Sequence, residues 1–299
     1  MELKKLGTFD TDIVEANPIV FQGKLWMMEY IRDGSRTSGR YHSPAVNNSY
    51  FRFRDMEDMT TFSAPFGLGL HMGNAFVRDG KIIVTAVENW GAPRFYLMTS
   101  EDMVHWTEPK VFLEGEGWEG YNTSLCWADD RYVVVFELGA PRELVKEPFT
   151  MFFAESKDLV NWSLVPGASG YRDVYTGGPM IRYFDGWFYW TYLDGSYEHG
   201  FMTHIARSRD LKKWEHSYKN PVIRYDEDDR KVYPKVQLTA DQQERIAKAE
   251  DINASDLDIC DWQGKCCILY SWGNQRGKEF LALAEADCTE KEFCESFFP

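Results

Sequence analysis

Four acidic side chains in this sequence are candidates for proton transfer. Asp256 and Asp258 stand two residues apart where a strand is predicted to open, so we expect their side chains to face the same way. Two carboxyl groups held close together raise the pKa of one of them, which suits acid–base work. Glu15 and Glu137 lie at the ends of other predicted strands. The alternatives are a solvated turn or a cation site for the two aspartates, and a structural contact for Glu137.

Amide, aromatic and histidine side chains occupy similar strand ends. Amides hydrogen-bond to hydroxyl groups, and exposed rings stack on sugars or bases. A histidine can donate a proton, although a single histidine is more often a satisfied hydrogen-bonding residue. The binding candidates are Asn17, His71, Asn74, Trp90, Trp118, Asn122, Tyr175, His204, Trp272, Asn274 and Gln275.

The spacings that mark several other chemistries are absent from the sequence. It has no HxxxH or HExxH pair, no glycine-rich phosphate loop and no GxSxG elbow. We therefore predict no metal ligands and no required cofactor, and leave open a structural cation in the centre of the fold. Five of the six cysteines fall in the last 40 residues without a CxxC, which favours buried free thiols.

The composition restricts the partners of the chain. Its 299 residues include 33 basic and 47 acidic ones, for a net charge of −14. Such a charge repels phosphate backbones and anionic lipid, so we expect neither nucleic-acid nor membrane partners. No run approaches the roughly 20 apolar residues of a spanning helix, and residues 1–10 lack the apolar core of a secretory signal. We expect a cytoplasmic protein, or an exported one given without its signal peptide.

A short pattern recurs along the chain and predicts its architecture. Each strong copy has a Ser, an Asp two residues later and a Trp four residues beyond that, and weaker copies keep the spacing. An apolar run with strand character precedes each copy, and a hairpin with Gly or Asp in its turn precedes that run. The repeated Asp is structural, since one catalytic centre has no use for a copy in every unit. The copies are Ser100–Trp106, Ser156–Trp162, Ser208–Trp214, Met56–Phe62 and Asp287–Phe293.

Five small antiparallel sheets cannot each bury both faces alone, but they can when packed around an axis. We predict an all-β, five-bladed β-propeller as one domain, 1–299, with a short helix within 239–250 inserted before the last blade. A β-sandwich with coincidental spacing is the alternative. The blades are expected at approximately 13–66, 70–114, 118–168, 172–226 and 252–299.

Propeller geometry places the candidate residues together. The first strand of each blade opens, and the second strand closes, on the same face of the disc near the axis. The carboxylates, amides and rings named above recur at these positions. One funnel lined in this way has the composition that a sugar pocket requires.

The repeat resembles that of the five-bladed glycoside hydrolases of families 43, 32 and 117. The likeness includes Asn17-Pro18 at an early strand opening and Gly178-Pro179 in the fourth blade, and it spans nearly the whole chain. Family 43 enzymes have an Asp base where this chain has Asn17, and a second Asp that falls near Asn122. Their general acid belongs to a Glu-Gly-Pro motif, which in this chain is Gly177-Gly178-Pro179. This triad cannot be carried over, because a glycine cannot donate a proton. The likeness to family 117 implies that a histidine, His71 or His204, could be the acid.

We therefore predict an exo-acting, inverting glycoside hydrolase that removes a terminal sugar, with Glu15 paired to Asp256 or Asp258. The loss of the family 43 acids supports a second hypothesis, a carbohydrate-binding propeller without activity. A glycoside phosphorylase is the third and needs inward-facing Arg, Lys or His, for which Arg207, Arg224 and His204 are available. The expected partner is a carbohydrate, and a homo-oligomer is left open.

Overall fold

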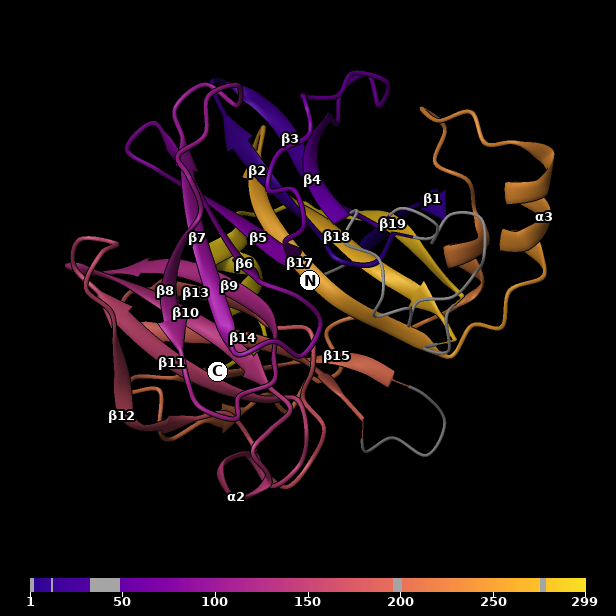
Figure 1. Ribbon diagram of the computed structural model, residues 1–299. Coiled ribbons are helices and arrows are strands. Elements are labelled where there is room, and N and C mark those ends of the chain that lie inside the picture. The colour runs from indigo at the N-terminus through magenta and orange to yellow at the C-terminus, as the bar shows by residue number, and fades with distance from the viewer. Residues whose placement is uncertain (1–2, 12, 33–48, 196–200, 275–277) are drawn as a thin grey trace.

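The computed structural model describes residues 3–11, 13–32, 49–195, 201–274 and 278–299. In these ranges the chain is nearly all β, with a few short helices (Figure 1). None of the helices there combines the length and apolar character that crossing a bilayer needs.

Antiparallel sheets of consecutive strands make up most of the fold. The first contains β2 (Ala16–Phe21), β3 (Lys24–Arg32) and β4 (Ser49–Asp55). The second contains β5 (His71–Arg78), β6 (Lys81–Val87), β7 (Arg94–Ser100) and β8 (Lys110–Glu114). The third contains β9 (Gly120–Ala128), β10 (Arg131–Leu138), β11 (Thr150–Ser156) and β12 (Ser163–Ser169).

A larger sheet of eight strands contains the rest of the described strands. One antiparallel half is β13 (Met180–Phe184), β14 (Trp187–Asp194), β15 (Phe201–Ser208) and β16 (Glu215–His216). The other half is β17 (Asn253–Trp262), β18 (Lys265–Gly273), β19 (Glu279–Ala286) and the N-terminal β1 (Lys4–Thr11). Two parallel residue pairs between β15 and β17 join the halves.

The first strands of these units contact one another in a closed circuit. β2 contacts β5, β5 contacts β9, β9 contacts β13, β13 contacts β17, and β17 contacts β2. Apolar side chains of neighbouring sheets form the core between them. The openings of all five strands therefore lie around one centre.

The predicted hairpin turns are confirmed. Each connects the first two strands of its unit, and its first residue has φ between 49° and 52°, as the tight turns that match strand twist require. The repeated Ser-x-Asp motif is confirmed as structural. Ser100 Oγ accepts from Met103 N at 2.9 Å and Asp102 Oδ1 accepts from His105 N at 2.7 Å, and the other strong copies repeat this arrangement.

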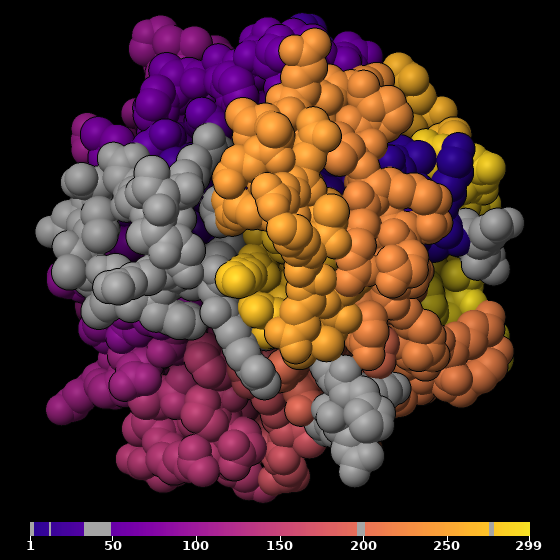
Figure 2. Space-filling model, turned by 90° about the vertical axis from the view of Figure 1, so that its right-hand side faces the viewer, coloured from indigo at the N-terminus to yellow at the C-terminus, as the bar shows by residue number. Residues whose placement is uncertain are grey.

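The predicted helical insertion is confirmed as α3 (Ala240–Ala247), which begins after a capping box between Thr239 and Gln242. It lies at the periphery, outside the sheets (Figure 1). The insertion is the whole segment between β16 and β17. It is orange in Figure 2 and spreads over one face of the molecule.

Two predictions about the last unit need correction. The range 252–299 omits β1, which pairs antiparallel with β19 and brings the two ends of the chain into one sheet. The weak repeat Asp287–Phe293 is not a turn of the repeated kind, because Thr289 caps α4 (Glu290–Glu295) there. Gly7 has φ of 119°, and a Cβ at this residue would stand 2.6 Å from Lys231 O, so β1 passes close to the insertion only because residue 7 is glycine.

A buried ionic cluster holds β1 in place. Lys5, whose side chain is 6% exposed, donates to Asp229 Oδ2 at 2.9 Å, and the Tyr270 hydroxyl donates to Asp229 Oδ1 at 2.6 Å. Asp229 belongs to the 3-10 helix η1 (Glu227–Arg230) of the insertion. The Thr8 hydroxyl donates to Asp229 O at 2.6 Å and accepts from Trp272 Nε1 at 2.6 Å. The insertion and the N-terminal strand therefore stabilise one another.

We predict that Asp229→Asn lowers the free energy of unfolding by about 3 kcal/mol, because the Lys5 ammonium loses its buried partner. Chemical denaturation measures this value. The control is Asp228→Asn, one residue away, where the side chain is 51% exposed and pairs with Lys231. The control should change stability by less than about 0.5 kcal/mol, and equal losses in both variants would contradict the role of the cluster.

Candidate functional site

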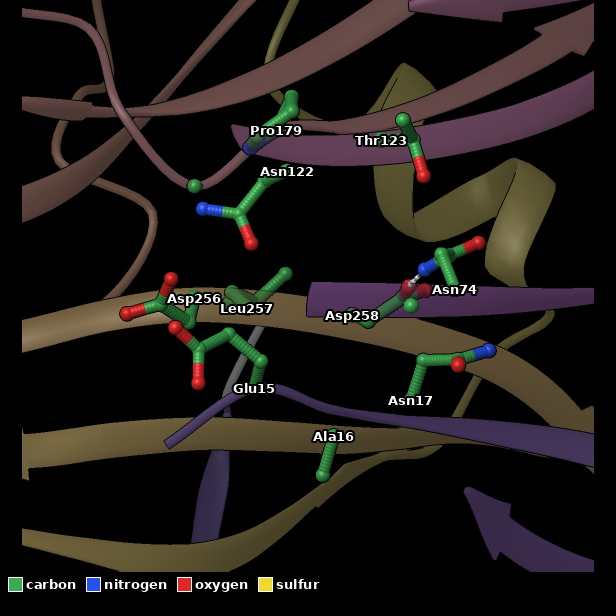
Figure 3. A pocket seen from close by; sticks show the side chains of 12 residues that line it. Glu15, Ala16, Asn17, Asn74, Asn122, Thr123, Pro179, Asp256, Leu257 and Asp258 are labelled. Carbon is green, nitrogen blue, oxygen red and sulfur yellow. Dashed lines mark hydrogen bonds between the residues drawn. The ribbon is translucent and has the colours of Figure 1, made fainter. Parts of the chain in front are cut away.

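Two adjoining pockets occupy the centre of the strand circuit. Their empty volumes, open mouths included, are about 790 Å³ and about 350 Å³. Glu15, Asn122, Gly178 and Asp256 line both, so the pockets form one funnel with a wider and a narrower part. Figure 3 shows the narrower part, with the carboxylates of Glu15 and Asp256 turned toward one another.

Asp256 enters the funnel because β17 is irregular at this residue. The pairing with β18 shifts register between Ser255 and Asp258, and Asp256 has φ of 50°. This geometry is that of a β-bulge, which turns a side chain away from its regular alternation. The Ser255 hydroxyl donates to Asp256 Oδ2 at 2.6 Å. Desolvation in the pocket and the charge of Glu15 raise the pKa of Asp256 to about 7.

Glu137, at the end of β10, is the second acid whose protonation is altered. Its side chain is 2% exposed, and burial raises its pKa to about 8, although hydrogen bonds from Gly178 N and Asn122 oppose this change. The donor–acceptor distances are 3.1 Å from Gly178 N and 3.4 Å from Asn122 Nδ2 to Glu137 Oε2. No cation pairs with Glu137 among the described residues. The carboxyl group is therefore largely protonated at neutral pH.

Two consecutive glycines make room for polar side chains of the funnel. A Cβ on Gly177 would stand 2.6 Å from the Tyr175 hydroxyl, and a Cβ on Gly178 would stand 2.7 Å from Asp256 Oδ1. Either atom would displace the neighbouring group, because real Cβ contacts under 3.0 Å are essentially absent. The Gly-Gly sequence therefore has a steric function in this pocket.

The prediction that Asp258 faces the same way as Asp256 is wrong. Because the bulge interrupts the strand alternation, Asp258 points away from Asp256, as Figure 3 shows. Asp258 accepts from Arg182 at 2.5 Å, from Asn74 Nδ2 at 2.9 Å and from Ile259 N at 2.7 Å. The Asp258 carboxylate and the Asn74 amide line the narrower pocket but are engaged in this network.

The Asn17 amide links two sheets. Its Nδ2 donates to Ala75 O at 2.8 Å and its Oδ1 accepts from Ala75 N at 3.0 Å. An aspartate at this position could accept from Ala75 N, but it could not donate to Ala75 O. The residue at the position of the family 43 base therefore has a structural contact here.

The structure does not bring the two candidate histidines to the funnel. The ring of His71 bonds to the Tyr30 hydroxyl at 2.5 Å and the Ser49 hydroxyl at 3.1 Å, and His204 contacts Asp194 at 3.3 Å. Burial lowers the pKa of each histidine to about 4, so both are neutral at neutral pH. Neither histidine lines the two pockets, so the structure gives no support to a histidine acid.

Among the aromatic and remaining amide candidates, Trp90, Tyr175 and Asn122 line the funnel. Trp272 does not, because it is fully buried beside β1. Trp118 packs 5.4 Å from Phe136, ring to ring, and lies outside both pockets. Asn274 accepts from Lys278 N at 3.3 Å, also outside. Gln275 lies outside the described residues.

Other acids at the same strand end as Glu137 are structural. Glu29 pairs with Arg52 at 2.6 Å and with Arg54 at 2.5 Å, and Glu88 pairs with Arg94 at 2.6 Å. Asp194 contacts His204. These pairs explain why equivalent positions in the sequence do not have equivalent functions.

Residues that the sequence reasoning missed also line the wider pocket: Val14, Met72, Tyr121, Phe149, Leu193 and Glu279. Glu279 opens β19, the third strand of its unit, and accepts from Asn253 Nδ2 at 3.0 Å. Site residues were predicted only where first strands open and second strands close. Third strands begin at the same face, so a Glu directly before an apolar run was the available signal.

The fold is shared with glycoside hydrolases of known structure. Solved structures similar to the chain include xylan β-1,4-xylosidase from Bacillus halodurans, with 15% identity and a TM-score of 0.61 over 97% of this chain and 55% of that one. A thermostable family-43 glycoside hydrolase has 10% identity and a TM-score of 0.59 over 91% and 89%. The α-L-arabinofuranosidase from Podospora anserina, in complex with cellotriose, has 12% identity and a TM-score of 0.62 over 95% and 97%.

At these identities the likeness shows the fold alone, a β-propeller, as the repeat predicted. The chain spans about half the length of the xylosidase. No protein-family model matches the sequence, and the search of curated proteins found no match.

Because the charge of Glu15 raises the pKa of Asp256, we predict that Glu15→Gln lowers the Asp256 pKa from about 7. Glu137 should shift less, since Glu15 is the smallest of its causes. Titration of the carboxyl carbons by ¹³C NMR measures both values. An unchanged Asp256 titration in a folded variant would contradict the pairing of Asp256 with Glu15.

Proposed function

We propose that this protein is a glycoside hydrolase with its active site in the central funnel of a five-bladed propeller. The circuit of first strands supports five blades: the three smaller sheets and the two halves of the larger one. The proposed hydrolytic activity rests on one observation. Two carboxyl groups with raised pKa values, Glu137 and Asp256, line one pocket together with Glu15.

In this proposal Glu137 is the general acid. Cleavage of a glycosidic bond needs a proton on the leaving oxygen while positive charge develops on the sugar ring. A carboxyl group with a pKa of about 8 holds its proton at neutral pH. After transfer, Gly178 N and Asn122 Nδ2 stabilise the carboxylate, because both already donate to Glu137 Oε2.

The Glu15–Asp256 pair is the proposed base. A pKa of about 7 for Asp256 means that its carboxyl group loses its proton near neutral pH and can then accept one from water. Gly178 lies between the acid and the base and so limits the distance between their oxygens. Its nitrogen donates to Glu137 Oε2 at 3.1 Å, and a Cβ on it would stand 2.7 Å from Asp256 Oδ1. With covalent bonds of about 1.5 Å between them, the two oxygens are at most about 9 Å apart.

That limit is compatible with inversion, in which the carboxyl groups are about 6.5–9.5 Å apart and water attacks directly. We propose an inverting reaction. Trp90, Tyr121 and Phe149 supply ring faces along the wider pocket, and rings of this kind stack on sugars. A single funnel bounded by first-strand openings suits the end of a saccharide, so exo action is part of the proposal.

A glycoside phosphorylase and a binding propeller would each need a pocket with other properties. Phosphorolysis needs cations, yet among the described residues no Lys, Arg or His lines either part of the funnel. Arg94 pairs with Glu88, and Arg172 donates to Leu144 O. A binding propeller needs no raised pKa. The proposed chemistry uses side chains alone, and a cation at the axis stays a prediction.

We predict that Glu137→Gln lowers kcat by roughly 10²–10⁴-fold on glycosides with poor leaving groups. The loss should be much smaller with a dinitrophenyl leaving group, which departs without protonation. A panel of aryl glycosides gives both values. Glu88→Gln, at the equivalent strand end outside the funnel, is the matched control and should retain wild-type turnover.

Some outcomes would overturn this assignment. Equal losses on good and poor leaving groups would remove Glu137 from the role of acid. Sugar binding by the wild type without any turnover would favour the binding propeller. ¹H NMR of the first product anomer distinguishes inversion from retention.

We predict a bell-shaped pH profile of kcat/KM with its maximum between about pH 7 and pH 8. Activity rises as Asp256 loses its proton near 7, because the base must be ionised. It falls as Glu137 loses its proton near 8, because the acid must be protonated. Initial rates from pH 5 to 10 measure both limbs, and Glu15→Gln should move the acidic limb toward lower pH and the alkaline limb less.

A further inference from the structure

Tyr175 holds an uncommitted hydroxyl group inside the funnel. Its ring packs against Phe149 and Phe201, with centroid separations of 5.1 and 6.3 Å, and a Cβ on Gly195 would stand 2.9 Å from the Tyr175 Cβ. These contacts fix the direction of the ring. Among the residues that the structure describes, no group forms a hydrogen bond to the Tyr175 hydroxyl.

The Tyr175 hydroxyl occupies the space that a side chain at Gly177 would fill. A Cβ at residue 177 would stand 2.6 Å from the hydroxyl oxygen and 2.9 Å from the ring carbon that bears it. The backbone of Gly177 is outside the positive-φ region that favours glycine, so the Tyr175 phenol is the reason for glycine here. This donor is held by packing beside a glycine and has no hydrogen-bond partner in the part of the chain that the structure describes, so it is available to a ligand.

The surroundings select the kind of ligand atom. Glu15, Glu137 and Asp256 line the same pocket and accept hydrogen bonds when ionised. Burial and these negative charges raise the pKa of Tyr175 well above its ordinary value, so the phenol stays a donor at working pH. A hydroxyl group is the ligand atom that fits both, since it donates to a carboxylate and accepts from the phenol.

We propose that Tyr175 is a specificity-determining residue whose hydroxyl donates to one hydroxyl oxygen of the terminal sugar, while that sugar hydroxyl donates to a neighbouring carboxylate. The proposal rests on the function proposed above and adds the residue that selects the sugar. It also gives Gly177 a function: to leave space for the donor.

The experiment measures kcat/KM of the wild type and Tyr175→Phe on the aryl glycoside that the wild type cleaves fastest, and on its monodeoxy analogues. On the parent glycoside, Tyr175→Phe should lose roughly 5–10-fold, as expected for one neutral hydrogen bond. At one deoxy position the loss should fall below 2-fold, because the partner of the phenol is already missing. At the other positions it should stay at the parent value.

Gly177→Ala is the independent variant, because its methyl group would occupy the place of the hydroxyl. It should show the same dependence on the deoxy position. Tyr171→Phe is the control: this partly buried tyrosine packs at a tilt against Trp190, lies outside the funnel and should leave every ratio unchanged. Thermal unfolding checks that each variant is folded.

A folded Tyr175→Phe with wild-type kcat/KM, or with the same loss at every deoxy position, overturns the inference and leaves the hydrolase intact. A wild type that neither cleaves nor binds any glycoside overturns both proposals. The two failures are therefore distinguishable.

Discussion

Removal of water from carboxyl groups at the centre of a closed ring is the constraint on which this site depends. First strands that contact one another around an axis leave little space for solvent where they open. Burial of Glu137 and the approach of Glu15 to Asp256 then disfavour the ionised forms and raise the pKa values. The same residue types at exposed strand ends would stay ionised. The contact between β17 and β2 closes the ring, and β1, held through Lys5 and Asp229, pairs the N-terminal end of the chain with the last unit.

Local signals predicted most of the fold. Gly or Asp in each hairpin turn and the Ser-x-Asp repeat satisfy backbone groups within a few residues of themselves, so each is legible in a short stretch of sequence. β1 was not predictable in this way. Its partner β19 lies at the other end of the chain, and register shifts on both sides of Gly7 and Thr8 weaken its alternation. Long-range pairing of an irregular strand leaves no local pattern.

The site was predicted in outline and missed in detail for a similar reason. Strand ends gave Glu15, Glu137 and Asp256 their common place. The bulge that separates Asp256 from Asp258 depends on the pairing of β17 with β18, and nothing in the spacing of two aspartates reveals it. Burial likewise decided the aromatic candidates, since Trp90 lines the funnel whereas Trp272 is enclosed by β1. The position of a residue along a strand predicts the face to which its side chain points, whereas the exposure of that side chain depends on packing.

The positions that correspond to the acids of family 43 hold residues with contacts of their own in this structure. Asn17 must donate to Ala75 O as well as accept from Ala75 N, which a carboxylate cannot do. Gly177 leaves the space that the Tyr175 hydroxyl fills. Asn122 donates to Glu137, so its amide stabilises an acid that lies on a different strand. A site that had only lost its acids would have no need of such complementary contacts. In the proposed hydrolase, Glu137 and the Glu15–Asp256 pair are the acid and the base, and these contacts support the structure around them.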